Sequence, residues 1–352
     1  MTVASSVPEI VARVEGRVGR ITLNRPKALH ALTEAMCGAI IAALLAWRAD
    51  DAIDLVLIDH AGERGFCAGG DIRAMAGSGA GDGEAGRAFF LAEYRMNDLL
   101  QRYPKPVAAV MDGVTMGGGV GLSVYALYRV ATERTLLAMP ETGIGLFPDI
   151  GAGWFLSRLP GEFGTWMALT GARLRAADCL HLNLCTHYVP SDRIEALKDT
   201  LLKGPSEARR ILARFNVDPG PAPLAGKQSA LDGLFAHDSV EAILASLQAG
   251  SSWAHAQAAI LETRSPTSMK VALRELRGGR ERLSFADEMA LEFRLACRMI
   301  AAHDFQEGVR AVVIDKDNAP RWRPARLEDV SEQSLDALFA PFTDQAEWTP
   351  ID

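Results

Sequence analysis

The sequence predicts an α/β fold followed by a mainly helical region, and two observations lead to this prediction. Short aliphatic and β-branched runs are each followed by a glycine-dense turn and a helical segment, and this succession recurs along the chain. Strand-like runs then stop near Gly161, after which helical periodicity dominates. We therefore expect an α/β core in residues 1–200, with the functional site at its turns, and a mainly helical C-terminal region in residues 201–352.

The first elements are predicted to be a hairpin, a helix and a buried strand. Residues 9–14 and 18–23 are β-rich runs on either side of Glu15-Gly16, which is typical of a hairpin. Residues 31–47 carry apolar side chains at helical spacing. Residues 53–58 are almost continuously aliphatic, as in a strand that is covered on both faces.

The following segments repeat this order of strand, glycine turn and helix. A glycine-bearing loop at 65–71 precedes a Gly- and Ala-rich segment, which we expect to be a flexible insert. The expected elements are the insert at 77–86, a helix at 89–103, a strand at 106–111, a glycine turn at 113–121, a helix starting at 122–128, and strands at 129–132 and 136–139.

The second half of the chain is expected to be helical. Residues 217–223 contain three prolines and one glycine, which predicts a linker. Helices are predicted around 165–169, 192–202, 240–248, 253–263, 266–277 and 285–301.

The composition excludes several classes of protein. The 352 residues are 49% hydrophobic and 23% charged, which argues against disorder. With 37 Lys and Arg against 44 Asp and Glu, the formal charge is -7 and no basic patch stands out, so we expect no nucleic-acid partner. No apolar run approaches the ~18–20 residues of a membrane span, and no secretory signal or presequence is recognised. The five cysteines show no metal-ligand spacing. We expect a soluble, reduced, cytoplasmic protein.

Two glycine loops are the main local signal for chemistry. Ala68-Gly69-Gly70 follows one predicted strand, and Gly117-Gly118-Gly119 opens a predicted helix after another. Glycine allows the backbone to approach a ligand closely and to leave amides pointing inward. Two such amides converging on one oxygen would form an oxyanion hole. The alternative interpretation is that these glycines serve tight turns and close packing of helix against strand.

The sequence does not match the other glycine-rich or nucleophile motifs that were considered. A dinucleotide-binding G-x-G-x-x-G pattern starting at Gly117 would need glycine where Leu122 stands, and the phosphate-loop pattern fails at Gln228. Ser123 lies outside any G-x-S-x-G context. Cys67 is interpreted as a small buried residue rather than as a nucleophile.

Two carboxylates stand in unusually apolar surroundings. Glu141 and Asp149 lie in a segment rich in proline, glycine and aliphatic residues, where burial would raise the pKa of a carboxyl group toward the range useful for proton transfer. The alternative is a Pro-Glu turn followed by an Asp that caps a helix over 153–159. These two interpretations remain open for both residues.

Taken together, the motifs resemble the crotonase (enoyl-CoA hydratase/isomerase) superfamily. Leu23-Asn24-Arg25-Pro26, Phe66-Cys67-Ala68-Gly69-Gly70-Asp71 and Gly113-Val-Thr-Met-Gly-Gly-Gly119 stand in the order of that superfamily. Residues 111–123, 139–149, 265–270 and 303–317 look like its 3-hydroxyisobutyryl-CoA hydrolase branch. The resemblance spans nearly the whole chain. It implies a crotonase-like spiral of repeated β-β-α units with a helical C-terminal region.

The resemblance also implies roles for individual residues. The amides of Ala68 and Gly118 would form the oxyanion hole for a thioester carbonyl, and the loop Cys67, Ala68, Gly69 and Gly70 would face the adenine of coenzyme A. Glu141 would be the general base or a covalent nucleophile. Asp149 would orient the catalytic groups or bind a substrate hydroxyl. Together with Gly118, Glu141 and Asp149, Glu93 would contact substrate; its alternative is a solvent-facing helical glutamate.

The resemblance separates hydrolysis from hydration at one position. Enoyl-CoA hydratases carry a second glutamate where this chain has Gly121, because adding water across a double bond uses two carboxylates. The implied activity is therefore hydrolysis of a short-chain 3-hydroxyacyl-CoA thioester in valine catabolism. An enoyl-CoA hydratase or isomerase, and a non-enzymatic acyl-CoA binding protein, are the alternatives. We expect an acyl-CoA substrate and no metal or redox cofactor; the resemblance leaves a homo-oligomer open.

Overall fold

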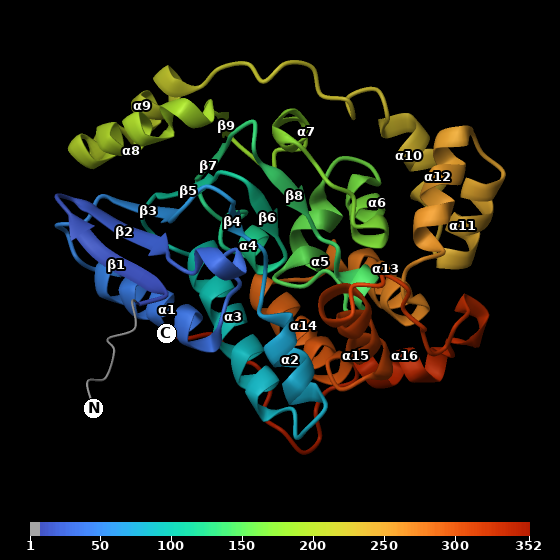
Figure 1. The fold of residues 1–352 in the computed structure, drawn as a ribbon. Coiled ribbons are helices and arrows are strands. Elements are labelled where there is room, and N and C mark those ends of the chain that lie inside the picture. Colours follow the sequence, from blue (N-terminus) through green and yellow to red (C-terminus); the bar gives the residue numbers. More distant parts are fainter. Residues whose placement is uncertain (1–7) are drawn as a thin grey trace. The chain divides into compact units, whose positions relative to one another are not determined.

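The computed structural model describes residues 8–352, which separate into two compact units that are interleaved along the sequence (Figure 1). This division differs from the one expected at residue 200, because the chain leaves and re-enters each unit. The first unit comprises residues 8–70, Leu99–Leu137 and Arg175–Gly220, and the second comprises Asp71–Asp98, Ala138–Leu174 and Pro221–Asp352.

Two sheets form the frame of the first unit, and successive strands supply them in turn. The six-stranded sheet has the order β1-β2-β3-β5-β7-β9, and the three-stranded sheet has the order β4-β6-β8. From β3 to β8 the chain alternates strictly between them, which makes a spiral of β-β units and confirms the predicted α/β fold class. The strands are β1 (Ile10–Glu15), β2 (Val18–Leu23), β3 (Leu55–His60), β4 (Gly65–Cys67), β5 (Val107–Met111), β6 (Val114–Met116), β7 (Tyr128–Ala131), β8 (Leu136–Ala138) and β9 (His187–Tyr188).

The predicted hairpin and the first helix are present. β1 and β2 pair antiparallel, whereas β2, β3, β5, β7 and β9 run parallel to one another. The first helix begins only at Glu34, later than expected, because Leu29 and His30 adopt positive φ and Thr33 caps the helix through the Met36 amide (3.2 Å). The helices of this unit are α1 (Glu34–Arg48), α4 (Gly118–Gly121), α7 (Ala176–His181), α8 (Ile194–Lys203) and α9 (Ala208–Phe215).

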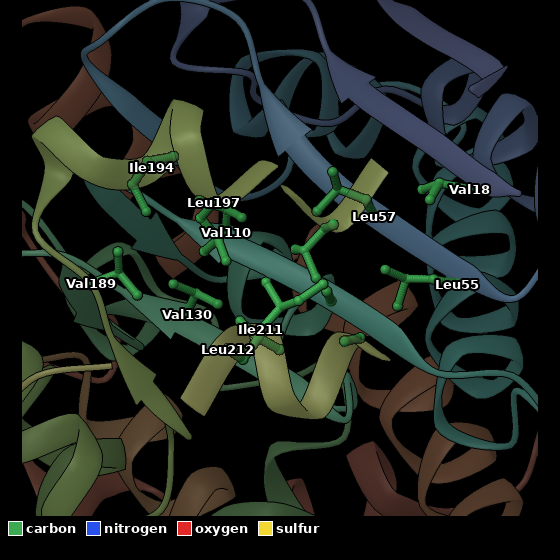
Figure 2. Close-up of a cluster of buried hydrophobic side chains, with 13 residues drawn as sticks. Val18, Leu55, Leu57, Val110, Val130, Val189, Ile194, Leu197, Ile211 and Leu212 are labelled. Carbon is green, nitrogen blue, oxygen red and sulfur yellow. The ribbon is translucent and has the colours of Figure 1, made fainter. Parts of the chain in front are cut away.

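The core of the first unit lies between its larger sheet and the helices α8 and α9 (Figure 2). Leu57 of β3 and Val110 of β5 point from the sheet toward Leu197 and Leu212 of these helices, and all four side chains are buried. Continuous aliphatic runs such as 53–58 are therefore explained by strands covered on both faces.

The second unit is almost entirely helical, as the C-terminal sequence predicted. The first segment of the second unit contains α2 and most of α3. The last three residues of α3 belong to the first unit. Its helices are α2 (Ile72–Gly79), α3 (Glu84–Gln101), α5 (Ala152–Phe155), α6 (Phe163–Thr170), α10 (Gln228–Phe235), α11 (Val240–Gln248), α12 (Ser252–Leu261), α13 (Pro266–Gly279), α14 (Phe285–Met299), α15 (His303–Val309) and α16 (Glu332–Phe339), with short 3-10 turns that include Glu141–Ile144 and Leu156–Arg158.

Three sequence-based expectations need correction. The segment 77–86 is not a flexible insert: a β-carbon on Gly79 or Gly86 would collide with Ile300, so these glycines permit close packing. The helix expected at 122–128 instead begins at Gly118 and ends after one turn. Strands do not stop at Gly161, because the two-residue β9 adds to the edge of the sheet. The linker at 217–223 is confirmed as a segment without helix or strand.

No helix within residues 8–352 combines the length and the apolar character that crossing a bilayer requires.

Replacing Leu57 by Ala tests the core. Leu57 is fully buried, so the substitution removes apolar contacts and leaves a cavity, and we expect the free energy of unfolding to fall by about 2–5 kcal/mol. Leu127→Ala, at a leucine that is 56% exposed, should change it by less than about 0.5 kcal/mol. Urea unfolding followed by circular dichroism measures both, and equal losses would contradict this account of the core.

Candidate active site

The two glycine loops of the first unit lie against each other, backbone to backbone. β4 pairs with β6, and each strand is followed by one of the loops. Gly69 has a φ of 103°, and a β-carbon there would lie 3.3 Å from the Met116 carbonyl oxygen and 3.6 Å from the Gly118 nitrogen. A β-carbon on Gly119 would collide with the Cys67 carbonyl. The glycines therefore serve close approach of the two backbones, which was the structural alternative.

The Ala68 amide is not free to bind a ligand. It donates a hydrogen bond to the Leu29 carbonyl (3.0 Å), while the Gly69 carbonyl accepts one from the Leu32 amide (2.8 Å). The next two amides along the loop, those of Gly69 and Gly70, have no hydrogen-bond acceptor among residues 8–352. The expectation of an oxyanion-binding amide at Ala68 therefore conflicts with its hydrogen bond, and Gly69 and Gly70 are the residues of this loop whose amides remain without an acceptor among residues 8–352.

The second candidate amide belongs to Gly118, the first residue of α4. The first amides of a helix have no acceptor within the helix. Gly117, which precedes it with a φ of 47°, uses its carbonyl to accept from Val120 (2.8 Å) and Gly121 (3.2 Å). The Gly118 amide has no recorded acceptor within residues 8–352, so its expected role in an oxyanion hole stays a prediction.

The thiol of Cys67 is held inside the protein. Its side chain is fully buried and its sulfur donates to the His30 carbonyl (3.2 Å). This supports the interpretation of Cys67 as a packing residue. Any contact of Cys67 with a ligand would have to use its backbone.

Three predicted acids come together in the second unit. Glu93 lies on α3, Glu141 opens the 3-10 turn after β8, and Asp149 lies in the segment before α5. Their exposed fractions are 2%, 5% and 5%. The solvent-facing alternative for Glu93 is thereby excluded. Tyr94, the residue after Glu93, donates its hydroxyl to Asp149 Oδ2 (2.7 Å).

Burial and mutual repulsion favour the protonated forms of these acids. Burial, followed by the charge of Asp149, holds the pKa of Glu141 well above its usual range, and burial, then Asp149 and Glu141, does the same for the pKa of Glu93. Burial raises the pKa of Asp149 from 3.8 to about 6, although the Tyr94 hydroxyl opposes this shift by stabilising the carboxylate. Asp149 can therefore accept and release a proton near pH 6, whereas the protonated form is favoured for Glu93 and Glu141.

Unpartnered oxygens point to a ligand at this acid group. Within residues 8–352, Glu93 Oε1 and Glu141 Oε2 are buried and have no hydrogen-bond partner. Buried polar atoms in proteins are nearly always satisfied, so such exceptions call for an explanation. Hydroxyl groups or a water molecule delivered with a substrate would satisfy both oxygens.

Sequence reasoning missed three features of this region. Tyr94 was not recognised as the partner of Asp149. Asn97, one helical turn after Glu93, is fully buried, and neither polar atom of its amide has a hydrogen-bond partner within residues 8–352. Its spacing of four from Glu93 was the available signal. A further group of buried glutamates on α13 and α14 gave no signal, because their spacing in sequence resembles that of ordinary surface positions.

Comparison with known proteins places the chain in a family. Residues 18–339 match the family model described as enoyl-CoA hydratase/isomerase. The chain is 46% identical to "3-hydroxyisobutyryl-CoA hydrolase, mitochondrial" of Danio rerio, over 94% of this chain and 89% of the relative. It is 41% identical to the protein of the same name in Homo sapiens, over 94% of this chain and 88% of the relative.

Solved structures share the fold over the same extent. A protein titled carnitinyl-CoA dehydratase from Mycobacterium thermoresistibile has a TM-score of 0.92 and 40% identity, covering 97% of this chain and 99% of its own. A protein titled enoyl-CoA hydratase from Rhodobacter sphaeroides has a TM-score of 0.89 and 39% identity, covering 97% and 100%. The expected crotonase-like fold is confirmed by these matches.

The relatives correct the expected cellular location. The curated relatives from Danio rerio and Homo sapiens are named as mitochondrial enzymes, which contradicts the cytoplasmic location expected from the sequence. The physical reason is that composition and cysteine usage describe the folded chain, whereas a compartment is addressed by targeting segments that are separate from the fold.

Asp149→Asn should stabilise the protein in a pH-dependent way. The pKa of Asp149 is about 6 in the folded state and 3.8 as its reference value, so ionisation costs stability as the pH rises from about 4 to 6. Asparagine never ionises, and we expect it to add roughly 1–3 kcal/mol to the free energy of unfolding at pH 7.5 and almost nothing at pH 4. Urea unfolding at both pH values measures this. Exposed Asp51→Asn is the control, and a gain that does not depend on pH would contradict the assignment.

Proposed function

Because the chain belongs to the enoyl-CoA hydratase/isomerase family, we propose that it hydrolyses 3-hydroxyisobutyryl-CoA to 3-hydroxyisobutyrate and CoA, a reaction of valine catabolism. The observation that carries the proposal is the similarity, over about nine-tenths of the chain, to relatives named as hydrolases of this thioester. The buried acids and the free backbone amides are the chemical groups that such a reaction needs.

The proposed role of the glycine loops is to bind the thioester oxygen. The amides of Gly70 and Gly118 donate hydrogen bonds to the carbonyl oxygen, and these bonds strengthen as negative charge develops there. Gly70 takes the place that the sequence had suggested for Ala68, whose amide is occupied by Leu29. The loop Cys67–Gly70 is proposed to contact the adenine of coenzyme A through its backbone.

Glu141 is proposed to drive the chemical step. As a general base its carboxylate takes a proton from water, the resulting hydroxide adds to the thioester carbon, and the tetrahedral intermediate collapses to the acid and CoA thiolate. As a nucleophile it would instead form a mixed anhydride with loss of CoA thiolate, and water would then hydrolyse the anhydride. Both routes need Glu141 ionised, although burial and the charge of Asp149 raise its pKa, so its proton has to pass to a neighbouring group before the step. Asp149 and Glu93 are proposed to bind the 3-hydroxyl group and to share protons with Glu141.

Hydration of an enoyl-CoA is the second candidate function, because the two solved structures described above carry hydratase and dehydratase titles. Gly121 argues against it. The resemblance implies a second carboxylate at that position in hydratases, and here a buried glycine of α4 stands there. A binding protein without turnover would need the glycine loops but not Glu141.

Replacing Glu141 by Gln tests both the activity and the residue. The wild-type protein should release free thiol from 3-hydroxyisobutyryl-CoA in proportion to enzyme, and Glu141→Gln should lower kcat by about 10²–10⁴-fold, because glutamine can neither take a proton nor attack. Release is followed with a thiol-reactive dye, and circular dichroism checks folding.

Loss of crotonyl-CoA absorbance without thiol release would favour the hydratase instead. Tight CoA binding with no turnover of either substrate would favour the binding protein. Near-normal hydrolysis by Glu141→Gln would refute the role given to Glu141.

Gly118→Pro tests the proposed amide. Proline is well accommodated at the first residue of a helix and lacks the N–H group, so we expect kcat to fall about 10²–10³-fold with little change in helical content. Gly118→Ala is the matched control, since it adds a β-carbon but keeps the amide. Equal activity of the two variants would show that the amide is not used.

A further inference from the structure

A second group of buried carboxylates lies in the second unit, apart from the three predicted acids. Glu275 is on α13, and Glu288 and Glu292 are one turn apart on α14. All three side chains are fully buried, and they offer oxygens within 4.8 Å of one another. Arg282 forms an ion pair with Glu288. We refer to Glu275, Glu288 and Glu292 as the glutamate cluster.

One member of the glutamate cluster holds the segment that carries Asp149. Glu292 Oε2 accepts a hydrogen bond from the Gly151 amide (2.7 Å), and this contact is buried. Two residues after Asp149, Gly151 has a φ of 86°, and the intervening Ile150 has a φ of 59°. A β-branched residue in the left-handed region is a strained conformation that persists only where its surroundings enforce it.

The rest of the segment packs directly on the glutamate cluster. A β-carbon on Gly153 would collide with Glu288 Oε1 and would lie 2.8 Å from Glu275 Cγ. From Asp149 to Gly153 the backbone therefore has two contacts with these side chains, the Gly151 hydrogen bond and the close packing at Gly153. Glu292 therefore contacts the strained turn that directly follows Asp149.

Burial of three carboxyl groups so close together favours their protonated forms, because a buried negative charge is unfavourable. Both oxygens of Glu275 and Oε1 of Glu292 have no hydrogen-bond partner within residues 8–352. A protonated carboxyl group turns an acceptor into a donor and can bond to the neighbouring carboxylate. Burial and the neighbouring glutamates raise the pKa of Glu275 and of Glu292, and burial raises the pKa of Glu288 to about 7 although Arg282 opposes it. The charged and titratable groups that act on the cluster are Asp149, Tyr94, Arg282 and Arg158.

We infer that Glu292 is a positioning residue for Asp149: it fixes the left-handed Ile150-Gly151 turn through the Gly151 amide, and Glu275 and Glu288 hold Glu292 in place by sharing protons with it. For its effect on catalysis the inference rests on the proposed function, because only then does Asp149 handle substrate. The arrangement of the turn itself does not depend on that function.

Two neutral replacements of similar size separate this role from simple packing. Glu292→Gln keeps an oxygen that accepts from Gly151, whereas Glu292→Leu fills the same space without an acceptor. We expect Glu292→Leu to lower kcat for 3-hydroxyisobutyryl-CoA about 10–100-fold with little change in KM, because small displacements of a catalytic group are costly. Glu292→Gln should stay within about threefold of wild type, and Glu281→Ala, at an exposed position, should match wild type.

A double-mutant cycle tests whether the effect of Glu292 on kcat depends on Asp149. In the Asp149→Asn background, Glu292→Leu should cost less than about twofold, because the group that it positions is already lost. A full and additive loss in that background would overturn the inference, as would equal activity of the Leu and Gln variants.

Hydrogen exchange provides a readout that does not require activity. In Glu292→Leu, peptides covering 149–155 should exchange faster than in wild type, and in Glu292→Gln they should not. If the wild-type protein fails to hydrolyse the thioester but shows this exchange pattern, the proposed function fails and the positioning of the turn stands. Unchanged exchange in Glu292→Leu would overturn the positioning. Stoichiometric binding of Mg²⁺ or Ca²⁺, measured by calorimetry and lost in Glu292→Leu, would overturn the proton sharing.

Discussion

A carboxylate loses a large hydration free energy when it leaves water, and the second unit buries two groups of three such side chains. The two groups compensate for this lost hydration free energy in different ways. Glu93, Glu141 and Asp149 have the Tyr94 hydroxyl and raised pKa values, and unpartnered oxygens remain. Glu275, Glu288 and Glu292 have Arg282, the Gly151 amide and one another. In the proposed function the first group exchanges protons with a substrate, and in the inference drawn above the second supports the backbone that carries Asp149.

The first unit contributes backbone rather than side chains to the proposed chemistry. Its alternating strands place two glycine loops against each other so closely that a β-carbon on Gly119 would not fit. Leu29 occupies the Ala68 amide, whereas the amides of Gly70 and Gly118 have no recorded acceptor within residues 8–352. Backbone donors held by such packing need no reorganisation when charge develops on a bound oxygen, and this is the source of their catalytic value.

A shared fold does not specify which reaction a member of this family catalyses. Individual side chains in the site distinguish the reactions. The same architecture occurs in proteins titled as a hydratase and as a dehydratase, whereas the curated relatives are named as thioester hydrolases. By the family resemblance, Gly121 stands where hydratases carry one of their two carboxylates, and Glu141 stands at the place of the other. Function therefore depends on a few groups placed on a shared frame.

The sequence alone determined the α/β class and the linker at 217–223, because periodicity and proline content are local properties. The family resemblance singled out Glu93, Glu141 and Asp149 as candidate acids, and their roles stay predictions. Only the tertiary structure decided that the helical unit takes in Asp71–Asp98 and Ala138–Leu174, since contacts between distant segments leave no local pattern. Only the structure also showed that the Ala68 amide is already hydrogen-bonded, because a bond to Leu29 cannot be read from glycine spacing. The glutamate cluster was invisible for the same reason: α13 and α14 place ordinary helical glutamates together only after they pack.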